Sequence, residues 1–508
     1  MKTLFTTLLI VITTSLYSQN IEWETNLGGS GNDSAYSTQQ TTDGGYIIAG
    51  RSQSSDGDVG GNNGNSDFWI VKLDDTGNLT WETNLGGSDD DFAWDVQQTT
   101  DEGYIVVGWS QSSDGDVGGN NGGWDFWIVK LDAVGTLVWE TNLGGSDDDL
   151  ALSVQQTSDG GYIVAGVSSS IDGDVGENNG NKDYWIVKLD NTGNLSWETN
   201  LGGTLDEEAL SIQQTADGGY IVSGGSTSNN GDVGGNNGSW DFWIVKLDST
   251  GNLSWETNLG GSSLDWAFSI KPTTDGDYIV VGSSQSTDGD VGGNNGEWDF
   301  WIIKLNAIGS LIWETNLGGS ANDRAFSIQQ TTDGGYIITG LSESSNGDVG
   351  GNNGGWDFWI VKLDTVGTLI WETNLGGSSD DIARSIQQTT DGSYIVAGRS
   401  ESTDGDLGGN NGGQDFWIVK LEGVLGIEDN LLSKNIILSP NPTSNTITIA
   451  NLSQEITKIE LLDMQGRLVL SQSEVINNTI NISHLQPATY LAKIYVGRTI
   501  FYKKVIKK

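Results

Sequence analysis

The 508-residue chain has no cysteine, a single histidine (His484) and only four prolines. The missing cysteines exclude disulfide bonds and thiol nucleophiles, and one histidine excludes histidine-dependent triads and most zinc sites. Basic residues are also scarce, with 23 Lys and Arg against 68 Asp and Glu, which leaves a formal net charge of −45. Because so acidic a surface repels phosphate, nucleic acid is disfavoured as a partner.

Long hydrophobic runs are missing as well. No segment of 18 apolar residues occurs, so no transmembrane helix is predicted. The first stretch, "MKTLFTTLLIVITTSLYSQN", places Lys2 before an apolar run that ends near Leu16, with the small residue Ser18 after it. This pattern predicts a secretory signal peptide over residues 1–18, and a buried N-terminal strand or helix is the alternative.

What the sequence does contain is a 58-residue repeat in seven copies. The letters "WETNLGG" begin at Trp23, Trp81, Trp139, Trp197, Trp255, Trp313 and Trp371. The letters "DFWIVKL", with minor changes, keep the same spacing without a single insertion. So constant a period indicates that every copy meets its neighbours in the same way.

Each copy predicts four short strands, which in the second copy cover 92–99, 103–110, 125–132 and 136–143. They are rich in β-branched and aromatic residues and are bounded by Gly, Asp and Asn. Four strands per unit, repeated seven times, predict an all-β fold, a seven-bladed β-propeller. The repeats open with a lone fourth strand (21–27) and end with a third strand (415–423). The N-terminal strand is therefore expected to complete the last blade and close the ring, with an open solenoid as the competing interpretation.

The letters "SIQQT", "DGGYIV" and "DFWIVKLD" resemble the secreted propeller repeats called SBBP repeats, over about residues 21–428. The resemblance implies the propeller fold, which we place at residues 19–426. That family has no single activity, so the resemblance implies none for this chain.

The C-terminal segment differs in charge from the repeats. From Asn430 to Lys508 there are nine Lys and Arg against four Asp and Glu, so the acidic excess lies in the repeats. The "SPNP" opening at Ser439, the segment from Asp463 to Arg467 and the final basic strand resemble the C-terminal sorting domain of the type IX secretion system. The resemblance implies a small β-sandwich over 435–508 after a linker at 427–434. It also implies recognition by the secretion machinery, passage through the periplasm and outer membrane, and release or surface attachment. A generic immunoglobulin-like binding domain is the alternative.

An acidic, glycine-rich loop recurs between the second and third strands. With Asp114 as position one, Asp116 is position three, Gly119 position six and Asp125 position twelve, which partly matches the ligand spacing of an EF-hand loop. The loops therefore predict calcium sites, and purely structural Asp, Asn and Gly turns are the alternative. The candidate ligands are Asp56, Asp58, Asp67, Asp114, Asp116, Asp125, Asp172, Asp174, Asp183, Asp288, Asp290, Asp299, Asp404, Asp406 and Asp415.

Ligand contact is expected from residues that differ between copies. Just before the third strand, four copies have a tryptophan where the others have Ser, Lys or Gln: Trp124, Trp240, Trp298 and Trp356. A tryptophan on a polar rim stacks on a sugar or packs into a partner protein. Folding back over its own loop is the alternative.

Catalysis has weak support in the sequence. Pairs of Asp serve glycosidases, but carboxylates that recur in every copy indicate architecture rather than a unique active site. The repeated lysines and glutamates, such as Lys72 and Glu82, predict a structural pair across each hairpin. The arginines Arg51, Arg324 and Arg384, together with Arg399, fall on several different blades. The sequence therefore predicts a secreted or cell-surface binding module for a glycan or a surface protein. A polysaccharide hydrolase and a passive surface component are the alternatives.

Overall fold

A computed structural model describes residues 19–423, 437–450, 456–462, 467–473, 475, 478–496 and 499–508. The predicted signal peptide and the predicted linker lie outside these residues. The chain divides into two compact units, Met1–Gly423 and Val424–Lys508. Among the described residues, no helix is long and apolar enough to cross a membrane.

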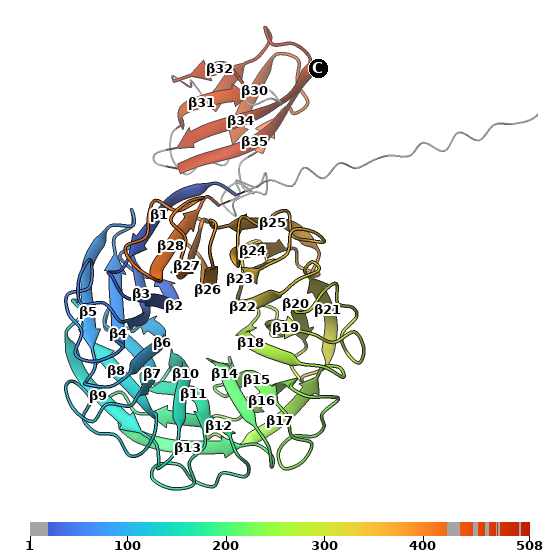
Figure 1. Cartoon of the computed structure of the whole chain (residues 1–508). Coiled ribbons are helices and arrows are strands. Elements are labelled where there is room, and N and C mark those ends of the chain that lie inside the picture. The colour runs from blue at the N-terminus through green and yellow to red at the C-terminus, as the bar shows by residue number, and fades with distance from the viewer. Residues whose placement is uncertain are drawn as a thin grey trace, which may run out of the picture. The chain divides into compact units, whose positions relative to one another are not determined.

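The first unit is a β-propeller, with its blades arranged as a ring (Figure 1). Its described residues form seven four-stranded antiparallel sheets, and the first strand of each blade lies nearest the centre of the ring (Figure 1). Blades 1 to 3 consist of β2 (Asp33–Gln40), β3 (Tyr46–Ser52), β4 (Asp67–Leu73), β5 (Leu79–Leu85); β6 (Asp91–Gln98), β7 (Tyr104–Ser110), β8 (Asp125–Leu131), β9 (Leu137–Leu143); and β10 (Asp149–Gln156), β11 (Tyr162–Ser168), β12 (Asp183–Leu189), β13 (Leu195–Leu201). Blades 4 and 5 consist of β14 (Glu207–Gln214), β15 (Tyr220–Ser226), β16 (Asp241–Leu247), β17 (Leu253–Leu259); and β18 (Asp265–Pro272), β19 (Tyr278–Ser284), β20 (Asp299–Leu305), β21 (Leu311–Leu317). Blade 6 consists of β22 (Asp323–Gln330), β23 (Tyr336–Ser342), β24 (Asp357–Leu363) and β25 (Leu369–Leu375).

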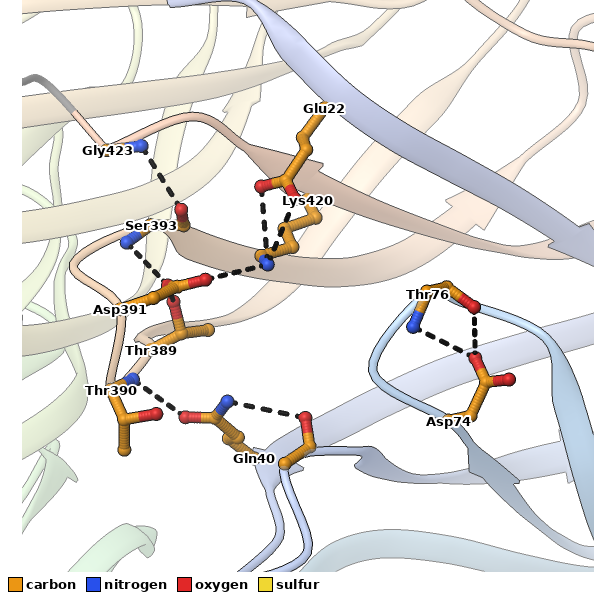
Figure 2. Close-up of polar contacts among 11 residues, drawn as sticks. Glu22, Gln40, Asp74, Thr76, Thr389, Thr390, Asp391, Ser393, Lys420 and Gly423 are labelled. Atoms are coloured by element: carbon orange, nitrogen blue, oxygen red, sulfur yellow. Dashed lines mark hydrogen bonds and ion pairs between the residues drawn. The ribbon is translucent and has the colours of Figure 1, made fainter. Parts of the chain in front are cut away.

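Blade 7 is built from both ends of the propeller, which confirms the predicted closure. It joins β26 (Asp381–Gln388), β27 (Tyr394–Ser400) and β28 (Asp415–Leu421) to the N-terminal strand β1 (Ile21–Leu27), which pairs antiparallel with β28. Lys420 Nζ lies 3.2 Å from Glu22 on β1 and 2.9 Å from Asp391 (Figure 2). Because β1 fills the outer edge of this blade, the first and last copies meet like any other neighbours.

The core lies between the blades. The third strands are buried along their whole length, and Phe68 of blade 1 packs against Trp127 of blade 2 with ring centroids 4.4 Å apart. The same contact recurs around the ring, from Phe126 to Trp185 and onward. Since neighbouring blades cover both faces of each third strand, its side chains are apolar without alternation, as in the letters "FWIV".

The expected lysine–glutamate pair does not form. Val71, not Lys72, lies opposite Glu82, and successive residues of a strand point to opposite faces. Lys72 Nζ instead lies 3.0 Å from Asp43 in the turn between β2 and β3, and Glu82 accepts a hydrogen bond from Trp69 Nε1 at 3.0 Å. The prediction was wrong because a one-residue difference in register exchanges the two faces.

The second unit is a two-sheet sandwich. One sheet contains β29 (Ile437–Ser439), β30 (Thr446–Ala450) and β33 (Thr479–Asn481), and the other contains β31 (Ile456–Leu462), β32 (Leu468–Gln472), β34 (Ala488–Val496) and β35 (Thr499–Lys507). Both sheets contribute to one core, in which Ile447 and Ile480 face Ile459 and Ile494. The sandwich is as expected, although most of the segment from Asp463 to Arg467 lies outside the described residues.

Candidate functional site

The long loops of the propeller are tied together on one face of the ring. In blade 1 the loop between β3 and β4 reaches the connection before β2, where the backbone N of Asp58 donates to the Gly28 carbonyl at 3.0 Å. Ser30 N, in the same connection, donates to Asp56 Oδ1 at 2.7 Å. The second-to-third and fourth-to-first loops therefore share a rim, which we call the loop face.

The candidate calcium ligands act as acceptors for backbone amides. Asp114 Oδ1 accepts from Ser88 N at 2.8 Å, and Asp116 Oδ2 accepts from Gly86 N at 3.3 Å. Asp125 points elsewhere, since its Oδ2 accepts from Asn121 N at 2.6 Å. The three positions of the EF-hand-like spacing are thus not brought together. The same kinds of contact recur at Asp56, Asp58, Asp67, Asp172, Asp174, Asp183, Asp288, Asp290, Asp299, Asp404, Asp406 and Asp415.

No group of three or more Asp, Glu, His or Cys side chains is gathered as a metal centre in the part of the chain that the structure describes. Calcium binding therefore stays a prediction. The Asp that opens each third strand is nevertheless in an unusual position. Asp125 is fully buried, and its Oδ1 has no hydrogen-bond partner within the described residues. Burial raises the pKa of Asp125 to about 7, and the neighbouring carboxylates Asp149 and Asp174 of the next blade add to the rise.

The predicted rim tryptophans pack into the loop face rather than standing free. Trp124 lies 5.2 Å from Phe92, centroid to centroid, and Trp240 stacks on Trp266 at 4.7 Å with an angle of 7° between the rings. Trp298 is only 7% exposed. Trp356 donates a hydrogen bond from Nε1 to a glutamate of its own blade. Trp124, Trp240 and Trp356 remain partly exposed.

A second set of copy-specific residues, which the sequence interpretation missed, lines the axis of the ring. In blade 1, Ala35 pairs with Gly50 and Ser37 with Ala49, so Tyr36 is the extra residue of a β-bulge. Every first strand has this bulge, and a bulge re-aims its extra side chain. The bulged residue lines an axial cavity of about 350 Å³, and it differs from copy to copy: Tyr36, Trp94, Leu152, Leu210, Phe268, Phe326 and Arg384.

These bulged side chains connect to the rim tryptophans through ring contacts. Tyr36 stacks on Trp94 at 4.5 Å, and the guanidinium of Arg384 lies 5.8 Å from the Tyr36 ring and 4.3 Å from the Phe326 ring. Phe326 in turn lies 5.0 Å from Phe268. The continuous series, which we call the channel arc, is Trp124, Trp109, Trp94, Tyr36, Arg384, Phe326, Phe268, Trp266 and Trp240.

The next layer of the cavity is serine in every blade except blade 2, where it is Asp95. Asp95 Oδ1 accepts from Ser37 Oγ at 2.8 Å, and its Oδ2 accepts from Val154 N at 2.9 Å. Burial raises the pKa of Asp95, and these hydrogen bonds oppose the rise. Asp95 thus joins three consecutive blades at the axis.

A ring of glutamines forms the third layer. Gln39 Oε1 accepts from Gln98 N of the next blade at 2.6 Å, and the same bond recurs from Gln97, Gln155, Gln329 and Gln387. Blade 5 interrupts the ring, because Pro272 has no N–H to donate and Lys271 has no acceptor to offer. Gln213 donates to its neighbour Ile212 instead. The signal for these residues was present in the sequence, since "SIKPTT" differs from "SIQQTT" at two letters.

Comparison with known proteins identifies the second unit. Residues 438–508 match the family described as the secretion system C-terminal sorting domain, which marks proteins that the type IX system exports to the cell surface or releases. A regulatory protein of Caulobacter vibrioides, FlaEY, is 25% identical over 271 residues, which are 49% of this chain. The match spans only 27% of that protein.

Solved structures similar to the chain include the WD40 domain of Neurospora crassa Pan2. It covers 79% of this chain and 97% of its own, with 10% identity and a TM-score of 0.40. The PQQ-bound aldose sugar dehydrogenase of Streptomyces coelicolor covers 80% of this chain and 98% of its own, with 10% identity and a TM-score of 0.37.

Proposed function

We propose that this exported propeller is a binding module of the cell surface or the surrounding medium, and that its ligand is a glycan. One observation carries the proposal. Side chains that differ between the copies line the axial cavity and the adjoining loop face, whereas the third and fourth strands, which repeat as "DFWIVKL" and "WETNL", are nearly uniform. A ring of identical units offers seven equal sites, so a single specific site has to come from such differences.

The chemistry of the cavity favours a sugar. Its volume of about 350 Å³ lies in the usual range for small-ligand sites, which combine aromatic walls with a few placed polar groups. Tyr36 and Trp94 present such walls, and aromatic rings pack against the apolar faces of sugar rings. A folded partner protein does not fit a cavity of this size, although the loop face offers it the tryptophans of the rim. A protein ligand is therefore the second candidate.

Binding is favoured over hydrolysis by the acids of the site. A glycosidase needs two carboxylates on opposite sides of the bond that it cleaves. Among the described residues that line the cavity, Asp95 is the one carboxylate, and both of its oxygens already accept hydrogen bonds.

Calcium in the acidic loops is a separate proposal. The net charge of −45 and the recurrence of the loop aspartates support it.

The test uses residues that the chain itself has in other copies. Trp94→Leu installs the residue found at Leu152 and Leu210, so the fold is expected to tolerate it. Purified protein is screened on a glycan array, and the affinity for the best ligand is measured by calorimetry. We expect Trp94→Leu to weaken binding by about 10-fold or more, because it removes a central aromatic contact.

The matched control is Val134→Thr in the exposed turn between β8 and β9, which installs the residue of Thr76 and should leave affinity unchanged. Release of reducing sugar by the wild type would show a hydrolase. Binding that Trp94→Leu leaves intact, or no binding to any glycan, would refute the proposal.

A further inference from the structure

The arginines of the propeller lack the partners that its composition would lead one to expect. The repeats contain four arginines among a large excess of carboxylates, yet none of the ion pairs formed by the described residues involves one of them. The Nε atoms of Arg51 and Arg384 are buried without a hydrogen-bond partner within the described residues. A partly buried cation without an opposite charge costs free energy, which an anionic ligand would offset.

The four arginines fall on three blades, as the sequence indicated, and all of them lie at the loop face or the cavity. The guanidinium of Arg324 lies 4.5 Å from the Trp298 ring, and that of Arg51 lies 4.7 Å from the Phe92 ring. Arg399 donates to Gln414 Oε1 at 3.1 Å. Arg384 lines the cavity itself, at the seventh position of the bulged layer. The ring therefore gathers residues that are far apart in the chain.

Arg384 is the arginine best placed for a ligand. Its guanidinium lies over Phe326, which holds the plane of the group while leaving its N–H donors without a carboxylate. Burial lowers the pKa of Arg384 to about 10, and the charges of Arg399 and Arg324 contribute to the decrease. The side chain still carries its charge at neutral pH, and no carboxylate is paired with that charge.

Lys271 adds a second cation to the same cavity. It replaces a glutamine of the third layer, and its side chain has no hydrogen bond or ion pair within the described residues. Burial lowers the pKa of Lys271, while Asp95 opposes the decrease. The cavity thus holds two basic side chains and one carboxylate, inside a protein whose net charge is −45.

We infer that the axial cavity binds an anionic sugar, whose carboxylate or sulfate group accepts hydrogen bonds from Arg384 while Lys271 supplies a second positive charge. The inference rests on the proposed glycan-binding function and names the class of glycan. A planar guanidinium binds such a group through two parallel N–H donors, which a lysine does not reproduce. The aromatic residues beside Arg384 hold the ring of the sugar, and the paired anion neutralises the buried charge.

The experiment compares ligands that differ only in charge. Titration calorimetry uses galacturonic acid oligomers, their methyl esters, galactose oligomers and sulfated galactose oligomers, with the full mature chain. We expect the carboxylated or the sulfated oligomer to bind about 30-fold more tightly than its neutral counterpart. That preference should weaken as salt is added. The two anionic arms distinguish a carboxylate from a sulfate as the group recognised.

Arg384→Phe installs the residue of Phe268 and Phe326, so it should fold, and it is expected to abolish the preference for the anionic oligomer. Arg384→Lys should retain only part of the preference for the anionic oligomer. Lys271→Gln should reduce that preference by less than Arg384→Phe does. Val134→Thr is the control for all three.

Two results would overturn the inference. One is equal binding of neutral and anionic oligomers by the wild type, and the other is an unchanged preference in Arg384→Phe. If neutral oligomers bind and Trp94→Leu weakens them, the proposed function stands although this inference fails. If no oligomer of either kind binds, this inference fails, and the glycan array alone decides the proposed function.

Discussion

At the residue scale, the aspartate that opens each third strand is the most unusual group of the repeat. Burial raises the pKa of Asp67 and Asp415 to about 6, and that of Asp125 to about 7. Burial also raises the pKa of the equivalent aspartates in the other four copies to about 7: Asp183, Asp241, Asp299 and Asp357. An aspartate in the unfolded chain titrates near pH 4, so between about pH 4 and 7 the folded state binds more protons. The stability from these groups is complete below pH 4 and is lost as the pH rises through about 7.

We therefore expect the melting temperature of the propeller, measured in EDTA, to rise when the pH is lowered from about 8 to about 5.5. Asp125→Asn removes one of the seven groups and gives Asp149 an N–H donor. The variant should be at least as stable as the wild type near pH 8. Its melting temperature should rise less than that of the wild type when the pH is lowered. Scanning calorimetry at the two pH values measures both effects.

The control is Asp132→Asn in an exposed turn, which installs the residue of Asn306 and should leave the pH dependence unchanged. A melting temperature for Asp125→Asn that is clearly below the wild type near pH 8 would contradict the account.

The sequence showed the aspartates but not their neighbours. Asp114, Asp116 and Asp125 are close in the chain, and the spacing suggested that they share one ion. In the structure the first two contact the connection before the blade, and Asp125 lies beside Asp149 of the next blade. Contacts between consecutive copies are set by how the blades pack, and spacing within one copy carries no information about them.

At the element scale, calcium binding would distinguish a metal site from a purely structural turn in the acidic loop. If the loops bind calcium, we expect Ca²⁺ added after EDTA treatment to raise the melting temperature by several degrees. Each site gives about 2.7 kcal/mol at a concentration about 100 times its Kd. Mg²⁺ serves as the control, because its octahedral preference suits a flexible loop poorly. An unchanged melting temperature would assign the loop aspartates to turn capping alone.

The N-terminal strand β1 is the element on which closure depends. Removing residues 19–27 leaves blade 7 with three strands and Trp417 Nε1 without Glu24, its acceptor at 3.2 Å. We expect the melting temperature to fall by about 10 °C or more. The control moves the segment to follow Leu421, joined by the turn that links β4 to β5, and should restore most of the loss. A truncated chain that melts like the wild type would show that closure contributes little.

The strands themselves were largely predictable, because each has a strong β pattern and clear turn signals. Predicted boundaries such as 125–132 agree closely with β8 (Asp125–Leu131). The bulge at Tyr36 was not predictable, since "AYS" gives no sign that its pairing partner skips a residue. That one irregularity turns the variable side chain toward the axis, so the channel arc escaped the sequence interpretation.

At the scale of the whole molecule, repetition and difference have separate roles. The repeated letters specify blade packing, and the closure of the ring followed from the lone strands at its two ends. The cavity residues that differ between copies come together only when the ring is closed, because closure brings Tyr36 of blade 1 against Arg384 of blade 7. Such a contact joins the two ends of the repeat region, so the sequence interpretation named the rim tryptophans and the arginines without bringing them together.

A crystal structure of the propeller with its best-binding glycan tests the central claim most directly. The account predicts one ligand per chain, with a sugar ring against Trp94 or Tyr36 and an anionic group at Arg384. A ligand repeated on equivalent loops of several blades, or one held on the opposite face of the ring, would contradict it.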